Sequence, residues 1–218
     1  GNLSGHEVCR WRSRGCFGAC VMHYAGQRRF DISRARAIRL TQWLFADRPS
    51  FEAQLREDIE LHIKRATKES RIPAIRLNAA SDLDWTHIVS MYPETQFFDY
   101  TKSAARMKRY LAGELPANYA LTFSASEKTP ASVLRGILDE GGNVAMVFTV
   151  PYCPQHDIYG DLPKTRTIDG KRFRIVDGDT HDIRIPSIDG RGRIVGLRLK
   201  GTNASKDRAV RFGFSVSK

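Results

Sequence analysis

Long apolar runs, glycine-rich phosphate loops and internal repeats are all missing from this sequence. The longest apolar runs, such as residues 143–150, are far too short to cross a bilayer, so we expect no membrane partner. The first residues contain no apolar stretch, and no signal peptide is expected. Without a glycine loop of the Walker or dinucleotide type, an ATPase or a nicotinamide-dependent enzyme is disfavoured.

Cysteine is also scarce, with four residues in a chain of 218. A chain of this length buries enough apolar surface to fold without disulfides. We therefore expect a reducing, cytoplasmic location, where clustered cysteines more often bind metals or take part in catalysis than form disulfide bonds.

Acidic residues are outnumbered, because 35 lysines and arginines face 24 aspartates and glutamates and give a net charge of +11. Between residues 10 and 39 there are eight arginines and a single acid, Asp31. Arginine forks match the geometry of phosphates, so a nucleic acid or a nucleotide is the expected partner, without a distinction between DNA and RNA. The alternative is a solvated basic helix face. The residues predicted to contact this polyanion are Arg10, Arg12, Arg14, Arg28 and Arg29.

Short apolar strands alternate with helical stretches over most of the chain. The predicted strands are residues 74–77, 95–98, 120–123, 143–149, 172–176 and 194–199, and the helices between the first five are residues 85–91, 104–112 and 132–139. This alternation predicts an α/β fold with parallel strands, arranged as a partial (β/α) barrel. An open doubly wound sheet is the alternative, and the turn-rich last third is also compatible with hairpins.

Two further helices, residues 33–46 and 50–68, are expected before the first strand, with Ser50 capping the second one. We expect one domain over residues 1–218. It would consist of a metal-binding cysteine loop (1–32), a helical segment (33–70) and βα repeats (71–218).

Polar residues follow several predicted strands, at the edge where ligands gather in parallel α/β folds. Helix caps and Asx turns are the plain explanation for single positions, but the recurrence predicts a common site. The residues predicted to move protons or position substrate are Asp82, Asp99, Lys102, Asp179 and His181. The residues predicted to bind a cofactor are Asn78, Ser124 and Lys200.

Three of the four cysteines form the cluster Cys9-x6-Cys16-x3-Cys20. Three thiolates can hold three irons of a [4Fe–4S] cluster and leave the fourth iron open. The arginines nearby would lower the thiol pKa values and offset the negative charge of a cluster. A zinc site with His6 or His23 as the fourth ligand is the main rival, and small buried cysteines without a metal are the third reading. Cys153 is either a distant fourth ligand or structural.

These motifs resemble a family of phage proteins that is named by gene number, gene 88, and not by an activity. The resemblance lies in residues 3–5, the cysteine segment with Ala25 and Gly26, and residues 76–82, 98–102, 116–124, 176–182 and 195–201. It implies no reaction, but it suggests a phage or prophage origin and therefore the cytoplasm of the host cell.

A looser similarity is to radical S-adenosylmethionine enzymes, which also place three cluster cysteines on a loop early in a partial β/α barrel. Their usual spacing, Cys-x3-Cys-x2-Cys, differs from the spacing here. The similarity implies that S-adenosylmethionine binds to the open iron.

Three functions follow as hypotheses. The first is an iron–sulfur enzyme, of the radical type, that acts on nucleic acid or a nucleotide. The second is a base-modifying or hydrolytic enzyme in which the cysteines are structural and Asp82 or Asp99 is the nucleophile or base. The third is a non-enzymatic nucleic-acid-binding protein whose metal stabilises the fold or senses redox state.

Overall fold

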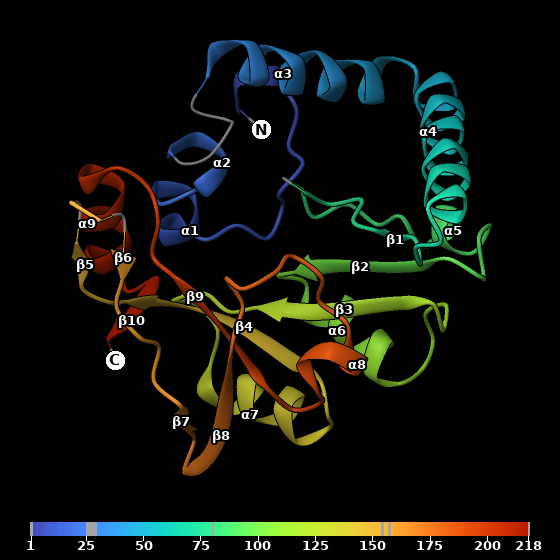
Figure 1. Cartoon of the computed structure of the whole chain (residues 1–218). Coiled ribbons are helices and arrows are strands. Elements are labelled where there is room, and N and C mark those ends of the chain that lie inside the picture. Colours follow the sequence, from blue (N-terminus) through green and yellow to red (C-terminus); the bar gives the residue numbers. More distant parts are fainter. Residues whose placement is uncertain (1, 25–29, 80, 154, 157, 218) are drawn as a thin grey trace.

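The computed structural model describes residues 2–24, 30–79, 81–153, 155–156 and 158–217. In these residues the chain forms an α/β fold around one mainly parallel sheet (Figure 1). The strands lie in the order β1-β2-β3-β4-β9-β8-β7, and β10 pairs with β4 beyond the end of β3. Their bounds are β1 (Ala74–Ile75), β2 (Gln96–Thr101), β3 (Tyr119–Ser124), β4 (Asn143–Thr149), β7 (Thr165–Ile168), β8 (Lys171–Asp177), β9 (Ile194–Arg198) and β10 (Ser215–Ser217).

The sheet is parallel except at one end, where β7 and β8 form an antiparallel hairpin. Asp169 and Gly170, the two residues between these strands, have φ values of 45° and 79°, as a tight hairpin turn of this kind requires. A second, small hairpin joins β5 (Tyr152–Cys153) and β6 (Ile158–Tyr159) outside the main sheet. The expected hairpin in the last third is therefore present at Asp169, whereas Asp177 and Asp189 end a strand and a short helix.

Strands β1 and β7 lie at opposite ends of the sheet, so the described strands do not close into a barrel. The predicted α/β class with parallel strands is confirmed. The first four strands are neighbours in chain order, joined by α5 (Thr86–Val89), α6 (Ala104–Leu111) and α7 (Ala131–Asp139). The order then changes, because β9 and not the next strand along the chain lies beside β4. This change ends the regular βα repeat that was expected to run to residue 218.

Two further helices frame the last parallel strands. Helix α8 (Pro186–Asp189) precedes β9, and helix α9 (Asn203–Arg211) joins β9 to β10. Thr202 begins α9 by accepting a hydrogen bond from the Ser205 N–H, just as Ser103 begins α6 by accepting one from the Arg106 N–H. Both caps place the helix start directly after a strand, at the edge where the polar residues were expected.

The N-terminal part of the chain is helical. It contains η1 (Asn2–Ser4), α1 (Arg14–Gly18), α2 (Val21–Tyr24), α3 (Asp31–Ala46) and α4 (Arg48–Lys68). The side chain of Asp47, and not the predicted Ser50, caps α4, because Asp47 Oδ1 accepts a hydrogen bond of 3.1 Å from the Ser50 N–H. None of the described helices is both long and apolar enough to span a membrane.

The main core lies between the sheet and the helices packed on it. Phe97, Tyr119, Phe148 and Ile194 from four strands are almost fully buried there, together with Met107 of α6. The core reaches Leu44 of α3 and Ile59 of α4 in the same continuous cluster. The helices that lead from the cysteine segment are thus attached to the body that carries the strand ends, while the one-domain division stays a prediction.

Candidate metal centre

The three clustered cysteines lie in a turn, in one short helix and between two short helices. Cys9 occupies a turn closed by a 3.0 Å hydrogen bond from the Arg12 N–H to its carbonyl oxygen. Cys16 lies within α1, which begins where Ser13 Oγ accepts a hydrogen bond of 3.1 Å from the Cys16 N–H. Cys20 follows α1 and precedes α2. The segment between Cys9 and Cys16 therefore contains a turn, and the segment between Cys16 and Cys20 contains the end of α1.

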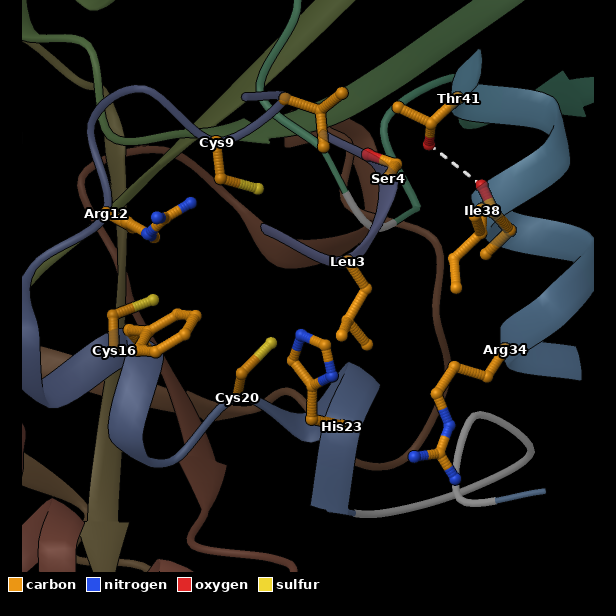
Figure 2. Close-up of a pocket in the computed structure, with 13 residues that line it drawn as sticks. Leu3, Ser4, Cys9, Arg12, Cys16, Cys20, His23, Arg34, Ile38 and Thr41 are labelled. Atoms are coloured by element: carbon orange, nitrogen blue, oxygen red, sulfur yellow. Dashed lines mark hydrogen bonds between the residues drawn. The ribbon is translucent and has the colours of Figure 1, made fainter. Parts of the chain in front are cut away.

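All three cysteine side chains line one cavity of about 130 Å³. Figure 2 shows the sulfurs of Cys9, Cys16 and Cys20 around a shared space, with the Arg12 guanidinium and the His23 ring beside them. Arg34 and Ile38 of α3 form the opposite wall. The cysteines are thiols in the structure, and Cys153, on the β5–β6 hairpin, does not line this cavity.

The Glu127 carboxylate holds the cysteine segment, residues 9–20, on the edge of the sheet. Glu127, in the loop after β3, accepts hydrogen bonds from Ser13 Oγ (2.5 Å) and from the Gly15 N–H (2.7 Å). Burial alone would raise the pKa of Glu127, but these hydrogen bonds lower it. A Cβ on Gly15 would lie 2.6 Å from Phe214 Cβ and 2.9 Å from Glu127 Oε2, so this position requires glycine. On the other side of α1, Arg208 Nε donates to the Gly18 carbonyl at 2.8 Å.

Beneath Cys9 and Cys16 lies a second cavity of about 100 Å³ at the carboxyl ends of the strands. Cys9, Arg12 and Cys16 line both cavities. The strand ends contribute the rest of the lining, namely Ser81, Asp82, Tyr100, Thr101, Lys102 and Ser124. Figure 1 shows the same arrangement, because the arrowheads of β2 and β3 point toward the side of the molecule that carries α1 and α9. Asp82, Lys102 and Ser124, three of the predicted site residues, thus line the same cavity as the predicted metal ligands Cys9 and Cys16.

Asp82 ties the loops after β1 and β2 together. Its Oδ1 accepts hydrogen bonds of 2.9 Å from Thr101 Oγ1 and from Arg106 Nη1, and its Oδ2 accepts one of 2.8 Å from the Lys102 N–H. The side chains of Asp82 and Arg106 are each only 9% exposed. The Asp82 N–H also donates to the Val8 carbonyl at 2.8 Å, next to Cys9. Both oxygens of Asp82 are therefore occupied in positioning, which favours a supporting role over attack on a substrate.

Lys102 places a buried cation beside the thiols. Its Nζ donates to the Ser124 carbonyl (3.1 Å), to Ser124 Oγ (2.9 Å) and to the Ala125 carbonyl (3.2 Å). All three acceptors are uncharged. Burial lowers the pKa of Lys102, whereas the nearby groups of Cys16 and Asp82 raise it. A buried cation with neutral hydrogen-bond partners is favourable only beside negative charge, and the carboxylates of Asp82 and Glu127 lie near enough to raise the pKa of Lys102.

Asp99 lies in the core and reaches neither cavity. Its carboxylate accepts hydrogen bonds from the Asn78 N–H (2.8 Å), from Asn78 Nδ2 (3.1 Å) and from the Tyr119 hydroxyl (2.9 Å). Burial raises the pKa of Asp99 to about 6, against these hydrogen bonds, which lower it. Asn78 Oδ1 in turn accepts from Ser81 Oγ and from the Leu83 N–H. The pair therefore shapes the loop that carries Asp82.

The pKa values of the thiols differ from the sequence-based expectation. Burial, followed by the proximity of Cys20 and Cys16, raises the pKa of Cys9 to about 11. Burial also raises the pKa of Cys16, although Lys102 and Arg12 act in the opposite direction. The expected lowering by arginines is thus outweighed by burial and by repulsion among the thiolates. Burial and repulsion both disfavour the thiolate form, and a bound metal cation would remove both penalties.

Residues 177–200 form a separate polar cluster that is already paired internally. Asp177 Oδ1 accepts from Arg198 Nη1 at 2.8 Å, and Asp179 accepts from Arg198 Nη1 at 3.2 Å and from Lys200 Nζ at 2.8 Å. His181 contacts Arg184, whose buried side chain forms a 2.8 Å ion pair with Asp189. None of Asp179, His181 and Lys200 lines either of the cysteine cavities. The structure does not bring these three predicted residues to the thiols.

Among the described residues, no group of three cysteine, histidine or acidic side chains is close enough together to hold a single ion. The side chains of Cys9, Cys16 and Cys20 line one cavity, and cationic side chains stand on its walls. A cluster binds each thiolate to a different iron and so needs less convergence than one ion does. The cluster and the zinc site both stay predictions.

The predicted nucleic-acid contacts are only partly described. Arg10 and Arg14 are exposed, and Arg12 is half-buried in an ion pair with Glu7. Arg28 and Arg29 lie outside the described residues. Sequence reasoning did not single out Arg106 or Tyr119, whose spacing from Asp82 and Asp99 gives no signal because the contacts cross from one strand to the next.

A comparison with protein-family models gives one match, to a family described as Gene product 88, over residues 1–213. Searches of the curated proteins and of the solved structures found no match. The resemblance to a family named by gene number is thereby confirmed. The similarity to radical S-adenosylmethionine enzymes receives no support from these comparisons.

Proposed function

This chain belongs to the Gene product 88 family, and we propose that it holds a [4Fe–4S] cluster on the thiolates of Cys9, Cys16 and Cys20. One observation carries the proposal: all three cysteines line a single cavity, and two of them, Cys9 and Cys16, also line the smaller cavity at the carboxyl ends of the parallel strands. Ligands bind at this edge in parallel α/β folds.

The chain supplies the charges that a three-thiolate cluster needs. The guanidiniums of Arg12 and Arg34 line the cavity, and Lys102 lies beneath Cys16. Together these cations offset the net negative charge of three thiolates and their cluster. A cluster held by three thiolates transfers electrons and leaves one iron open to a further ligand. His23 and Arg12 are the residues placed to orient that ligand.

The substrate side of the proposal is a nucleic acid or a nucleotide. The net charge of +11 favours a polyanionic partner, and a phage gene product would meet it in the cytoplasm of the host cell. Lys102 and Ser124 line the smaller cavity and would contact a substrate that enters it, while Asp82 holds the backbone of Lys102. As a further, separable part of the proposal, the open iron would be the position at which S-adenosylmethionine binds.

Zinc is the second candidate, because His23 lines the same cavity as the three cysteines. A site of three thiolates and one imidazole would be closed and structural. The protein would then stabilise its N-terminal segment with the metal and bind nucleic acid without redox chemistry, or use aspartate chemistry elsewhere.

Metal analysis distinguishes these candidates. The protein is purified without oxygen, its visible spectrum is recorded, and iron, sulfide and zinc are measured per chain. We expect broad charge-transfer absorption and about four irons with about four sulfides per chain. A colourless protein that carries stoichiometric zinc would overturn the cluster.

Single variants then test which side chains hold the metal. Alanine at Cys9, Cys16 or Cys20 is expected to abolish cluster binding. Cys153→Ala is the matched control, because its thiol lies on the β5–β6 hairpin and bonds to Gln155 instead. His23→Ala should leave iron content unchanged but would lower zinc content in a zinc site. Equal metal loss in the Cys153 variant would show that the assignment is wrong.

A further inference from the structure

Exposed aromatic rings with arginines beside them occur in the cysteine segment. Trp11 is 48% exposed and Phe17 is 41% exposed. The guanidinium of Arg10 lies 5.6 Å from the centre of the Trp11 ring, and that of Arg12 lies 4.8 Å from the centre of the Phe17 ring. An exposed ring with a guanidinium beside it offers a flat face for stacking next to a positive charge.

The same pairing continues onto α9, which packs against α1. The Phe212 ring has the guanidinium of Arg14 at 4.5 Å and that of Arg211 at 6.0 Å from its centre. This contact links the helix start in the cysteine segment to the end of α9. We call the combined surface the arginine–aromatic surface, and its residues are Arg10, Trp11, Arg14, Phe17, Arg211 and Phe212.

The positive charge of this surface is available to a partner. Arg10, Arg14 and Arg211 are exposed, and no carboxylate in the described parts of the chain lies within ion-pair distance of any of them. Arg12 differs, because it pairs with Glu7. Three guanidiniums without a carboxylate partner, next to flat rings, match a ligand that alternates negative charge with aromatic groups.

We propose that the arginine–aromatic surface binds single-stranded nucleic acid. Unpaired bases stack on Trp11 and Phe17, and phosphates contact Arg10, Arg14 and Arg211. A duplex keeps its bases stacked on one another, so it would use the arginines but not the exposed rings. The proposal deepens the nucleic-acid part of the proposed function and does not depend on which metal the cysteines bind.

The surface also leads to the thiol cavity. Phe17 lines that cavity and is exposed at the same time, and Cys16 precedes it in α1. A base stacked on Phe17 therefore lies at the entrance to the space that the three sulfurs surround. In this arrangement the strand is held by α1 and α9, and one nucleotide is presented to the metal centre.

Fluorescence anisotropy with labelled thymidine and uridine oligonucleotides, and with the thymidine strand annealed to its complement, tests the proposal. We expect both single strands to bind more tightly than the duplex. The ratio of the affinities for the thymidine and the uridine strand shows whether DNA or RNA is preferred. Trp11→Ala should weaken single-strand binding about 5- to 100-fold, because stacking on one ring is lost. Trp11→Phe, which keeps a flat ring, should restore most of it.

A matched pair of double variants separates this surface from general electrostatics. Arg10→Gln with Arg14→Gln removes two charges from the surface, and Arg172→Gln with Arg174→Gln removes two exposed charges from β8, at the far end of the sheet. The first pair should weaken binding and reduce the slope of log affinity against log salt by about 1.4. The β8 pair should change neither by more than a small fraction of that.

Three results would overturn the proposal: equal affinity for duplex and single strand, equal effects of the two charge pairs, or no effect of Trp11→Ala. Iron and zinc are measured on the same samples. Loss of strand binding with normal metal content counts against this inference alone, and intact strand binding without iron counts against the cluster alone.

Discussion

Two polar regions of this molecule lie at the carboxyl ends of strands in the same sheet. They differ in whether their polar side chains are already paired with groups of opposite charge. In the region of β8 and β9, Asp177 and Asp179 share Arg198, and Lys200 completes the cluster. Beside the ends of β1 to β3, two thiols line the strand-end cavity and join the third in a neighbouring one, and burial raises the pKa values of Cys9 and Cys16. The first region is balanced by its own ion pairs, whereas a cation that bound the thiolates would stabilise the second.

The two regions also differ in their exposure to water. The Asp82–Arg106 pair beneath the cysteines is buried, while the Asp177 side chain is 36% exposed and that of Lys200 is 43% exposed. Water screens Asp177 and Lys200 at the rim of the β8–β9 cluster, so their ion pairs contribute little to stability, although Arg198 and Asp179 are only 14% and 16% exposed. A polar residue after a strand is therefore a poor guide to function until its partners and its burial are known.

The largest expected difference between the regions is at the aspartates that pair with arginine. Asp82→Ala leaves the Arg106 guanidinium buried without its partner and should lower the free energy of unfolding by about 3–5 kcal/mol. Asp177→Ala, in the exposed cluster, should cost about 0–1 kcal/mol. Urea unfolding of both variants measures the contrast, and similar losses at the two positions would contradict it.

Opposite pH dependences are expected of Asp99 and Asp177. Burial raises the pKa of Asp99 from 3.8 to about 6. Its protonated form is thus preferred in the folded state, so its contribution is complete below about pH 4 and is lost as the pH rises through 6. The loss is about 3 kcal/mol. For Asp177, the hydrogen bond from Arg198 lowers the pKa, so its contribution is lost instead as the pH falls.

Unfolding free energies measured from about pH 2, below the ordinary pKa of an aspartate, to about pH 7 test both signs. The difference between wild type and Asp99→Asn should shrink or reverse as the pH rises, and the difference between wild type and Asp177→Asn should grow. A wild-type advantage over Asp99→Asn that is the same at every pH would rule out the raised pKa.

The two glycines of α1 sharpen the account of how the cysteine segment is held. Gly15→Ala places a Cβ against Phe214 and Glu127 and should lower the free energy of unfolding by about 1–3 kcal/mol, with weaker metal binding. At Gly18 the nearest atom to an added Cβ is 3.5 Å away, so Gly18→Ala is a tolerated control. Thermal unfolding and metal content report on both. Equal behaviour would mean that the contact with Glu127 does not hold the segment.

The smallest effect is expected at Lys200, in the exposed cluster. Lys200→Met removes one 2.8 Å contact with Asp179, which keeps its hydrogen bonds from Arg198, and should cost about 0–1 kcal/mol. Metal content and strand binding should be unchanged. A clear loss of either would restore the cofactor-binding role that the sequence predicted for Lys200.

Local patterns explain why so much of the fold was predictable. The strand at 143–149 has the predicted bounds, and the other predicted strands differ from the observed ones by a few residues at their ends. Helices α6 and α7 also begin or end within one residue of their predicted bounds. Apolar period and helix caps act over a few residues, so a single sequence records them. The placement of β9 beside β4 has no such local cause. The interpretation as a partial barrel depended on the order of the strands, which local patterns do not record.

The candidate site shows the same division between local and distant information. The spacing of Cys9, Cys16 and Cys20 predicted that the thiols would gather, and they line one cavity. Nothing in the spacing showed that the Asp99 carboxylate would accept hydrogen bonds from Asn78 and Tyr119. The pairing of Asp179 with Arg198 was equally hidden. Each of these partners comes from a different strand or loop, and only the packing of the sheet brings them into contact.

The sequence by itself determined the class of the fold, the strand ends and the gathering of three thiols, because periodicity, caps and short spacings operate within one segment of chain. The tertiary structure decided which polar residues are already paired, which thiols are buried, and which rings and guanidiniums remain exposed beside them. Those properties depend on burial and on hydrogen-bond partners supplied by distant segments. Burial sets the pKa values of the thiols, and exposure leaves Trp11 and Phe17 in water.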